Sequence, residues 1–134
     1  MTFHGIRGAI SVERDEAHAI HSATRTLLGS IVLENQVAVS DIGGVFFTAT
    51  PDLSAAYPAT AAREMGWTHV PLLCAQEMAV RDSLPRCIRV MVMWNTERSP
   101  EQIRHIYLGR ARALRPDLVD LGGTDAGLEK ETKQ

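Results

Sequence analysis

Hydrophobic and polar residues along the chain follow patterns that predict a series of strands and helices. Residues 3–12 alternate as a strand, which places Ile6 and Ile10 on one face and Arg7 on the other. Residues 15–35 repeat apolar side chains at helical spacing, and Asp15 is expected to cap the start of that helix. The other predicted elements are a strand at 44–50, a short helix at 58–66, and strands at 70–75 and 87–94.

The end of the chain predicts one more helix and a tail. Ser99, Pro100 and Gln102 are typical of a capped helix start, so a helix is expected from there to about residue 113. Residues 119–134 contain little apolar material and are expected to form a flexible C-terminal tail, which leaves 1–118 as a single domain. The polar loop between the strands at 70–75 and 87–94 favours a hairpin-like pair.

The order of these elements predicts an α/β (α+β) fold, with a mixed sheet packed on one face by two main helices. The strand at 87–94 is largely apolar on both faces: Ile88 and Val90 point to one side, and Cys87 and Met91 point to the other. Because two helices on one side cannot cover both faces, we expect self-association to cover the second face.

Composition and charge exclude several classes of function. A chain of 134 residues with 45% hydrophobic and 22% charged residues is typical of one globular domain. A net charge of −2 argues against nucleic acid as a partner. The longest apolar run, residues 90–94, is too short for a membrane span, and no signal peptide is expected, so we predict a cytoplasmic protein. Cys74 and Cys87 are expected to stay reduced there.

Arginines are the candidate chemical groups. Arg89 lies in the middle of an apolar strand, where an unpaired guanidinium is costly, so it requires an anion. That anion could be a carboxylate of the protein or a ligand, and the residues alone leave both open. Arg7 also lies within a strand, near Gly5 and Gly8. Arg63 and Arg115, taken singly, are typical of solvated surface charges.

Ordered motifs across the chain carry a resemblance to a known family. They include Gly5-Ile6-Arg7-Gly8-Ala9, Thr48-Ala49-Thr50-Pro51-Asp52-Leu53, Tyr57-Pro58-Ala59, Cys74-Ala75-Gln76-Glu77-Met78, Cys87-Ile88-Arg89-Val90, Ile103-Arg104-His105-Ile106-Tyr107-Leu108 and Leu114-Arg115-Pro116-Asp117-Leu118. Over residues 3–118 the chain resembles the monofunctional trimeric class of chorismate mutases. The resemblance implies a homotrimer with a barrel-like core of sheets and three active sites at subunit interfaces.

The resemblance also implies a reaction and a role for each residue. Chorismate is rearranged to prephenate in aromatic amino acid biosynthesis without metal or cofactor, through a cyclic transition state. Arg89 is expected to face the ether oxygen, Arg7 to pair with a substrate carboxylate, and Glu77 to accept a hydrogen bond from the ring hydroxyl. The other expected substrate contacts are Tyr107, Cys74, Tyr57, Ala59, Thr60, Leu72 and Leu73, with Arg63 and Arg115 at the rim.

Two departures from the family pattern concern substrate affinity. Thr60 stands where the family can carry a lysine, and Leu73 stands where it can carry a hydroxyl-bearing residue. Two other functions stay open: a trimeric imine or enamine deaminase, and a non-catalytic ligand-binding trimer. Arg7, Glu77, Arg89 and Tyr107 argue against a deaminase, which must position an attacking water.

Overall fold

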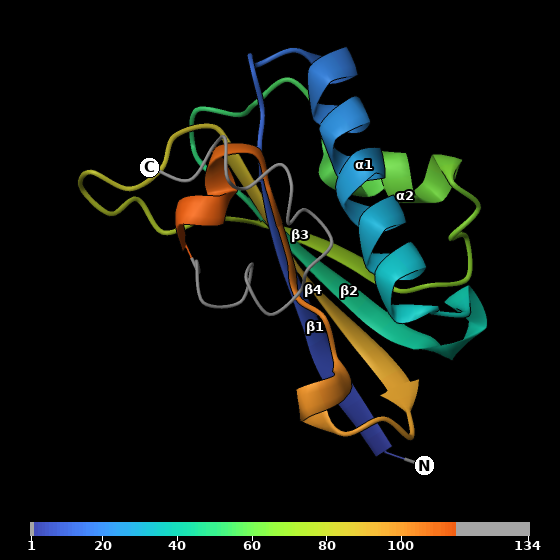
Figure 1. Ribbon diagram of the computed structural model, residues 1–134. Helices are drawn as coiled ribbons and strands as arrows, with labels where there is room; N and C mark the ends of the chain where they lie inside the picture. The colour runs from blue at the N-terminus through green and yellow to red at the C-terminus, as the bar shows by residue number, and fades with distance from the viewer. Residues whose placement is uncertain (1, 115–134) are drawn as a thin grey trace.

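The computed structural model describes residues 2–114, and these form one mixed sheet of five strands with two α-helices (Figure 1). The strands are β1 (Thr2–Ser11), β2 (Ile42–Ala49), β3 (Leu72–Gln76), β4 (Cys87–Thr96) and β5 (Ile106–Leu108). The α-helices are α1 (Ala17–Asn35) and α2 (Pro58–Glu64), and short 3-10 helices span η1 (Val39–Asp41), η2 (Pro100–Gln102) and η3 (Gly109–Leu114). Arg115 and the expected tail at 119–134 lie outside the described residues.

The strand order is β3-β2-β4-β1-β5. β4 runs antiparallel to its neighbours β1 and β2, while β1 pairs with β5, and β2 with β3, in parallel. The expected α+β class with a mixed sheet is therefore confirmed. The expected hairpin of β3 and β4 is wrong, because β2 lies between these strands. α2 links β2 to β3 as a parallel crossover, which places β3 at the far edge of the sheet.

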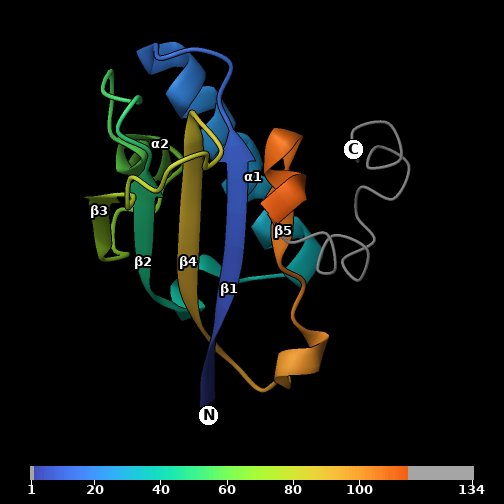
Figure 2. The same ribbon diagram turned by 90° about the vertical axis from the view of Figure 1, so that its left-hand side faces the viewer.

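Both α-helices cover the same face of the sheet, as Figure 2 shows with the strands in front and α1 and α2 behind them. Leu27 and Ile31 of α1 are fully buried against that face, together with Ile6 of β1. Gly8 permits the close approach, since an added Cβ would lie 3.0 Å from the Ile106 carbonyl oxygen and 3.1 Å from Ile31 Cδ1. The alternation predicted for residues 3–12 thus places the core side of β1 correctly.

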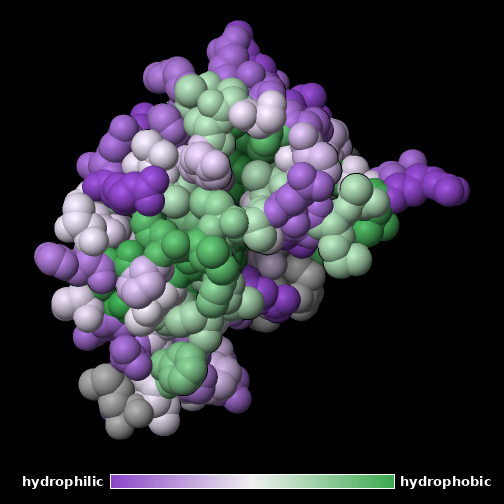
Figure 3. All heavy atoms as spheres, turned by 180° about the vertical axis from the view of Figure 1, so that it is seen from behind, coloured by the Kyte–Doolittle hydropathy of each residue, from purple (hydrophilic) through white to green (hydrophobic). Residues whose placement is uncertain are grey.

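Among residues 2–114, no helix covers the opposite face of the sheet, which we call the open face. The register places Leu73, Phe46, Met91 and Arg7 in one row across the strands, and Phe46 and Leu73 remain 50% and 57% exposed. Figure 3 looks onto the β3 edge of the sheet and not onto the open face, and it shows apolar side chains gathered over the middle of that side. Apolar side chains on an uncovered sheet face are typical of a surface that another chain covers.

The start of α1 differs from the expectation. The helix begins at Ala17 with Glu16 as its N-cap, and Glu16 makes no side-chain capping bond. Asp15, the predicted cap, instead accepts hydrogen bonds from the backbone N–H groups of Ser54 and Ala55, both at 2.9 Å. These bonds, the one from Ala55 foremost, lower the pKa of the Asp15 carboxyl. Asp15 therefore holds the loop before α2.

The predicted helix at 99–113 is wrong. Its start signal is real, since the Ser99 N–H donates to Gln102 Oε1 at 2.9 Å, but the helical turn ends at Gln102. The chain then forms β5, which pairs with Gly8–Ile10 of β1 before the 3-10 helix η3 begins. The open edge of β1 offers backbone hydrogen bonds that outweigh the local preference for a helix.

No helix among residues 2–114 is long and apolar enough to cross a membrane.

Candidate active site

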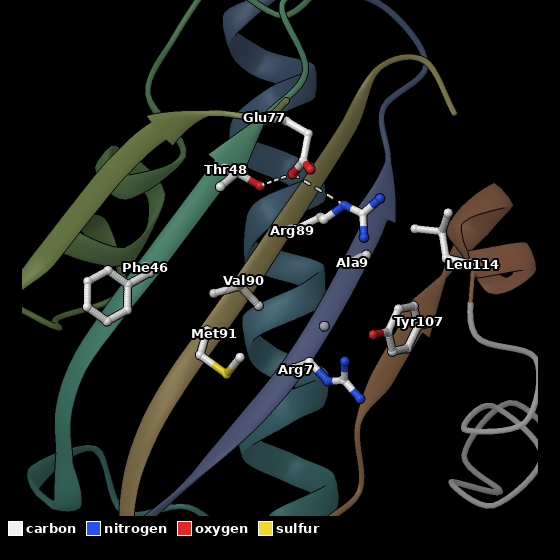
Figure 4. Close-up of a pocket in the computed structure, with 11 residues that line it drawn as sticks. Arg7, Ala9, Phe46, Thr48, Glu77, Arg89, Val90, Met91, Tyr107 and Leu114 are labelled. Carbon is white, nitrogen blue, oxygen red and sulfur yellow. Dashed lines mark hydrogen bonds and ion pairs between the residues drawn. The ribbon is translucent and has the colours of Figure 1, made fainter. Parts of the chain in front are cut away.

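A cavity of about 400 Å³ lies on the open face of the sheet, over the middle strands and the end of η3. It is lined by Arg7, Gly8, Ala9, Phe46, Thr48, Glu77, Arg89, Val90, Met91, Tyr107 and Leu114, and Figure 4 shows these side chains. We call it the arginine pocket. It brings together four of the residues that the sequence predicted, namely Arg7, Glu77, Arg89 and Tyr107.

Strand register explains why these side chains meet. Thr48 of β2 is paired with Arg89 of β4, Arg89 with Ala9 of β1, and Ala9 with Tyr107 of β5. The small, buried Ala9 separates the guanidinium from the phenol and leaves space above the sheet. Arg7 lies two residues before Ala9, so it is a diagonal neighbour of Arg89 at about 7–8 Å between Cα atoms.

The two guanidinium groups face the same space. In Figure 4, Arg89 extends from β4 over β1, Arg7 extends from β1 toward β5, and the hydroxyl of Tyr107 points back toward β1. Arg7 forms no ion pair with any side chain among residues 2–114. Two cations and a hydroxyl donor that line one cavity are chemically suited to an anion that carries more than one charge.

Glu77 holds Arg89 in place. Its Oε1 lies 3.3 Å from Arg89 Nε as an ion pair, although the angle is not that of a hydrogen bond. The Thr48 hydroxyl donates to the same Oε1 at 2.5 Å. Arg89 thus has a protein carboxylate as partner, yet its side chain stays 42% exposed on the pocket side. Of the two alternatives left open by the sequence, the protein carboxylate is observed at one edge of the guanidinium, and the exposed remainder leaves room for a ligand.

Cys87 lies two residues before Arg89 on β4, on the same face of the sheet. Cys87 is 1% exposed. Burial raises the pKa of its thiol to about 11, the carboxylates of Glu77 and Asp52 add to the increase, and the charge of Arg89 opposes it. Cys87 is therefore protonated at neutral pH and does not act as a nucleophile. Cys74 is half-buried, and both thiols are free.

The other predicted site residues lie elsewhere on the chain. A second cavity of about 480 Å³ is formed by residues 49–51 and 53–58 with Cys74, Ala75 and Gln76, and it shares no residue with the arginine pocket. We call it the loop pocket. Tyr57 and Cys74 line it. Leu72 and Leu73 lie on β3, while Ala59, Thr60 and Arg63 lie on α2, where Ala59 is buried and Arg63 exposed.

Sequence reasoning missed part of the arginine pocket. Thr48, Phe46, Met91 and Leu114 line the cavity but were not proposed as site residues. The alternation of β2 contains a signal for two of them, since Val45 and Phe47 are buried and Phe46 and Thr48 therefore point to the open face. The contact of Thr48 with Glu77 depends on strand order, which the local pattern does not encode.

No group of three or more His, Cys, Asp or Glu side chains within the described part of the chain is arranged to hold a metal ion.

The fold and the arginine pocket define a class of protein: an α+β subunit with two arginines suited to a small polyanion, on a sheet face that no helix among residues 2–114 covers. The family model for chorismate mutase type I matches residues 3–118. The chain belongs to this family.

Individual relatives agree with this assignment. The chain is 50% identical over 115 residues to chorismate mutase AroH of Thermus thermophilus, a match covering 85% of this chain and 94% of that protein. It is 47% identical over 119 residues to chorismate mutase AroH of Bacillus subtilis (strain 168), covering 88% and 94%. The solved structure of a chorismate mutase from Clostridium thermocellum is similar with a TM-score of 0.80 and 43% identity, covering 81% of this chain and 97% of that one.

Proposed function

We propose that the arginine pocket rearranges chorismate to prephenate, a step toward phenylalanine and tyrosine. Membership of the family makes this chain a chorismate mutase, an isomerase. The observation that carries the mechanism is the convergence of Arg7, Arg89, Glu77 and Tyr107 on one cavity. The reaction is intramolecular, so its atoms and electrons balance within the substrate and no cofactor is required.

Electrostatics and substrate conformation supply the catalysis. The substrate is a flexible dianion that must fold into a compact ring-like geometry before its ether carbon–oxygen bond breaks. Arg7 and Tyr107 bind a carboxylate and hold this geometry, which converts conformational freedom into a bound near-attack arrangement. Arg89 faces the ether oxygen, where negative charge grows, so its interaction strengthens toward the transition state.

Glu77 has two roles in this proposal. It fixes Arg89 through the 3.3 Å ion pair, and it accepts a hydrogen bond from the ring hydroxyl of the substrate. Its carboxylate also lies on the side of the ring where positive character develops. Because Thr48 already donates to Oε1, the second oxygen is the one that serves the substrate.

The active site is completed by a second subunit in a homotrimer. The exposed apolar row on the open face and the separation of the predicted residues into two pockets support this assembly. The arginine pocket of one subunit then faces the loop pocket of its neighbour, so that Cys74 and Tyr57 contact the substrate from across the interface. The trimer places its sheets around a barrel-like core.

The residues around the loop pocket contribute walls and a rim. Leu72, Leu73 and Ala59 supply apolar and backbone contacts, and Arg63 lies at the rim with Thr60 near the mouth. Arg115 is assigned to the rim by resemblance alone, since it lies outside the described residues. Thr60 lacks the charge of a lysine, so we expect it to weaken the affinity for the dianionic substrate more than it lowers kcat.

A cytoplasmic location of the protein belongs to the same proposal.

The test is to follow the loss of the diene absorbance of chorismate with purified protein, in chelator and with nothing else added. Conversion to prephenate supports the proposal. Binding of chorismate without conversion would instead identify a non-catalytic ligand-binding trimer.

A further inference from the structure

Arg7 is held by a side chain as well as by strand pairing. Its backbone N–H donates to His105 Nδ1 at 3.0 Å. The parallel ladder between β1 and β5 begins one residue later, at the pair of Gly8 and Ile106. The imidazole of His105 therefore takes the place of a backbone acceptor where the ladder has not yet started, and it extends the connection between the two strands to Arg7.

The segment before β5 is itself fixed by α1. Asn35, the last residue of the helix, is fully buried, and its amide binds both backbone groups of Arg104. Its Oδ1 accepts from the Arg104 N–H at 2.8 Å, and its Nδ2 donates to the Arg104 carbonyl at 2.9 Å. Nδ2 also donates to Ile31 O at 3.0 Å, which fixes the amide to its own helix. A strand of three residues with such an anchor has little freedom to shift.

We infer that His105 and Asn35 are positioning residues for the proposed active site. Asn35 fixes the backbone at Arg104, His105 fixes the backbone of Arg7, and Tyr107 follows two residues later on β5. The inference rests on the proposed roles of Arg7 and Tyr107. His105 acts as a hydrogen-bond acceptor with an unprotonated Nδ1, and it takes no proton from the substrate.

The reason for such an arrangement is the sensitivity of the reaction to geometry. A catalytic group displaced by about 1 Å can cost about 10²-fold in rate, even when the change lies away from the reacting atoms. Arg7 lies on a strand whose partner on this side is short, so hydrogen bonds at 104 and 105 determine how well its guanidinium is placed.

The test compares two amides at position 105. In His105→Asn the side-chain oxygen lies as many bonds from Cβ as Nδ1 does, so it can still accept from the Arg7 N–H. In His105→Gln the amide reaches one bond further and misses that position. We expect His105→Gln to lower kcat by about tenfold with KM changed less than about threefold, and His105→Asn to retain most of kcat.

Two further measurements separate positioning from general stability. Amide hydrogen exchange at Arg7, followed by NMR, is expected to be faster in His105→Gln than in His105→Asn or the parent protein. Glu34→Gln is the matched control, because it removes the 3.4 Å ion pair between Glu34 and Arg104 while the backbone clamp of Asn35 stays intact. Its kcat is expected to match that of the parent.

Different results of these experiments contradict the positioning role of His105 and the proposed function. If the parent protein converts chorismate and His105→Gln keeps both full kcat and slow exchange at Arg7, the inference is wrong. If His105→Gln and His105→Asn lose kcat equally, the acceptor at Nδ1 is not the cause and the inference is also wrong. A parent protein that does not convert chorismate would overturn the proposed function, and the inference with it.

Discussion

Arg89 Nε lies 3.3 Å from Glu77 Oε1 on the open face of the sheet, and this ion pair determines which edge of the guanidinium faces the cavity. The pair is half-exposed, so it contributes little to the stability of the fold. Its value is orientation: with Nε occupied by Glu77, the terminal N–H groups of Arg89 are directed into the arginine pocket, as Figure 4 shows.

Replacing Arg89 by lysine tests the role of the guanidinium. Arg89→Lys is expected to lower kcat by about 10²–10³-fold, because an ammonium group cannot both pair with Glu77 and donate toward the ether oxygen. Circular dichroism and the sedimentation coefficient are expected to stay unchanged. The measurement is steady-state kinetics of chorismate loss, and a kcat near that of the parent protein would remove Arg89 from its central role.

Thr48 offers a test of how Glu77 is held. Thr48→Val keeps the shape of the side chain and removes the hydroxyl that donates to Glu77 Oε1, so Glu77 and Arg89 gain freedom. We expect kcat/KM to fall by about fivefold, the effect of one lost hydrogen bond of about 1 kcal/mol. Thr48→Ser retains the hydroxyl and is expected to keep kcat/KM close to the parent value. Equal losses in the two variants would show that the hydroxyl is not the relevant group.

Local pattern predicted much of the fold. The alternation around Ile6 and Ile10 and the helical repeat of Leu27 and Ile31 reflect burial, which strand and helix periodicity express directly in the sequence. The predicted helix after Ser99 failed for the opposite reason. Its start signal was local and correct, but the outcome depended on the free edge of β1, a feature distant in the sequence.

The candidate site was predicted through Arg7 and Arg89, because a charge within an apolar strand requires a partner. The family resemblance added Glu77 and Tyr107. The hydrophobic pattern of the sequence could not show that Tyr57 and Cys74 lie in the loop pocket and not in the arginine pocket, because this separation results from the strand order. His105 belongs to one of the family motifs but was given no role, and its contact with the Arg7 backbone appears only where β5 begins.

The buried thiol of Cys87 is expected to lower the free energy of unfolding at alkaline pH. Burial raises the pKa of its thiol to about 11 from 9.0, so above pH 9 the unfolded chain loses this proton while the folded chain keeps it. The stabilisation is complete below about pH 9 and is lost as pH rises to about 11. We expect the difference in unfolding free energy between the parent protein and Cys87→Ala to shrink by about 2 kcal/mol between pH 7.5 and 10.5.

The measurement for Cys87 is urea unfolding at both pH values and one fixed protein concentration, because assembly couples stability to concentration. Cys74→Ala is the matched control at the half-buried cysteine. A difference for Cys87→Ala that stays constant with pH would show that its thiol ionises alike in the folded and unfolded chains.

The separation of the site into two pockets leads to a test of the assembly. Arg89→Ala damages the arginine pocket, and Cys74→Phe fills part of the loop pocket, so each variant alone is expected to lose at least about 10²-fold in kcat/KM. If the two pockets of one active site come from different subunits, co-refolding equal amounts of both variants creates interfaces that combine two intact halves. Random mixing around a ring makes about one quarter of the sites intact, so about a quarter of the parent activity is expected to return.

If each site lay within one chain, every site would carry a damaged half and no activity would return. Sedimentation equilibrium completes the test, because the proposed homotrimer has three times the mass of the 14.7 kDa chain, and recovery of activity in a species of that mass would tie the shared site to the trimer.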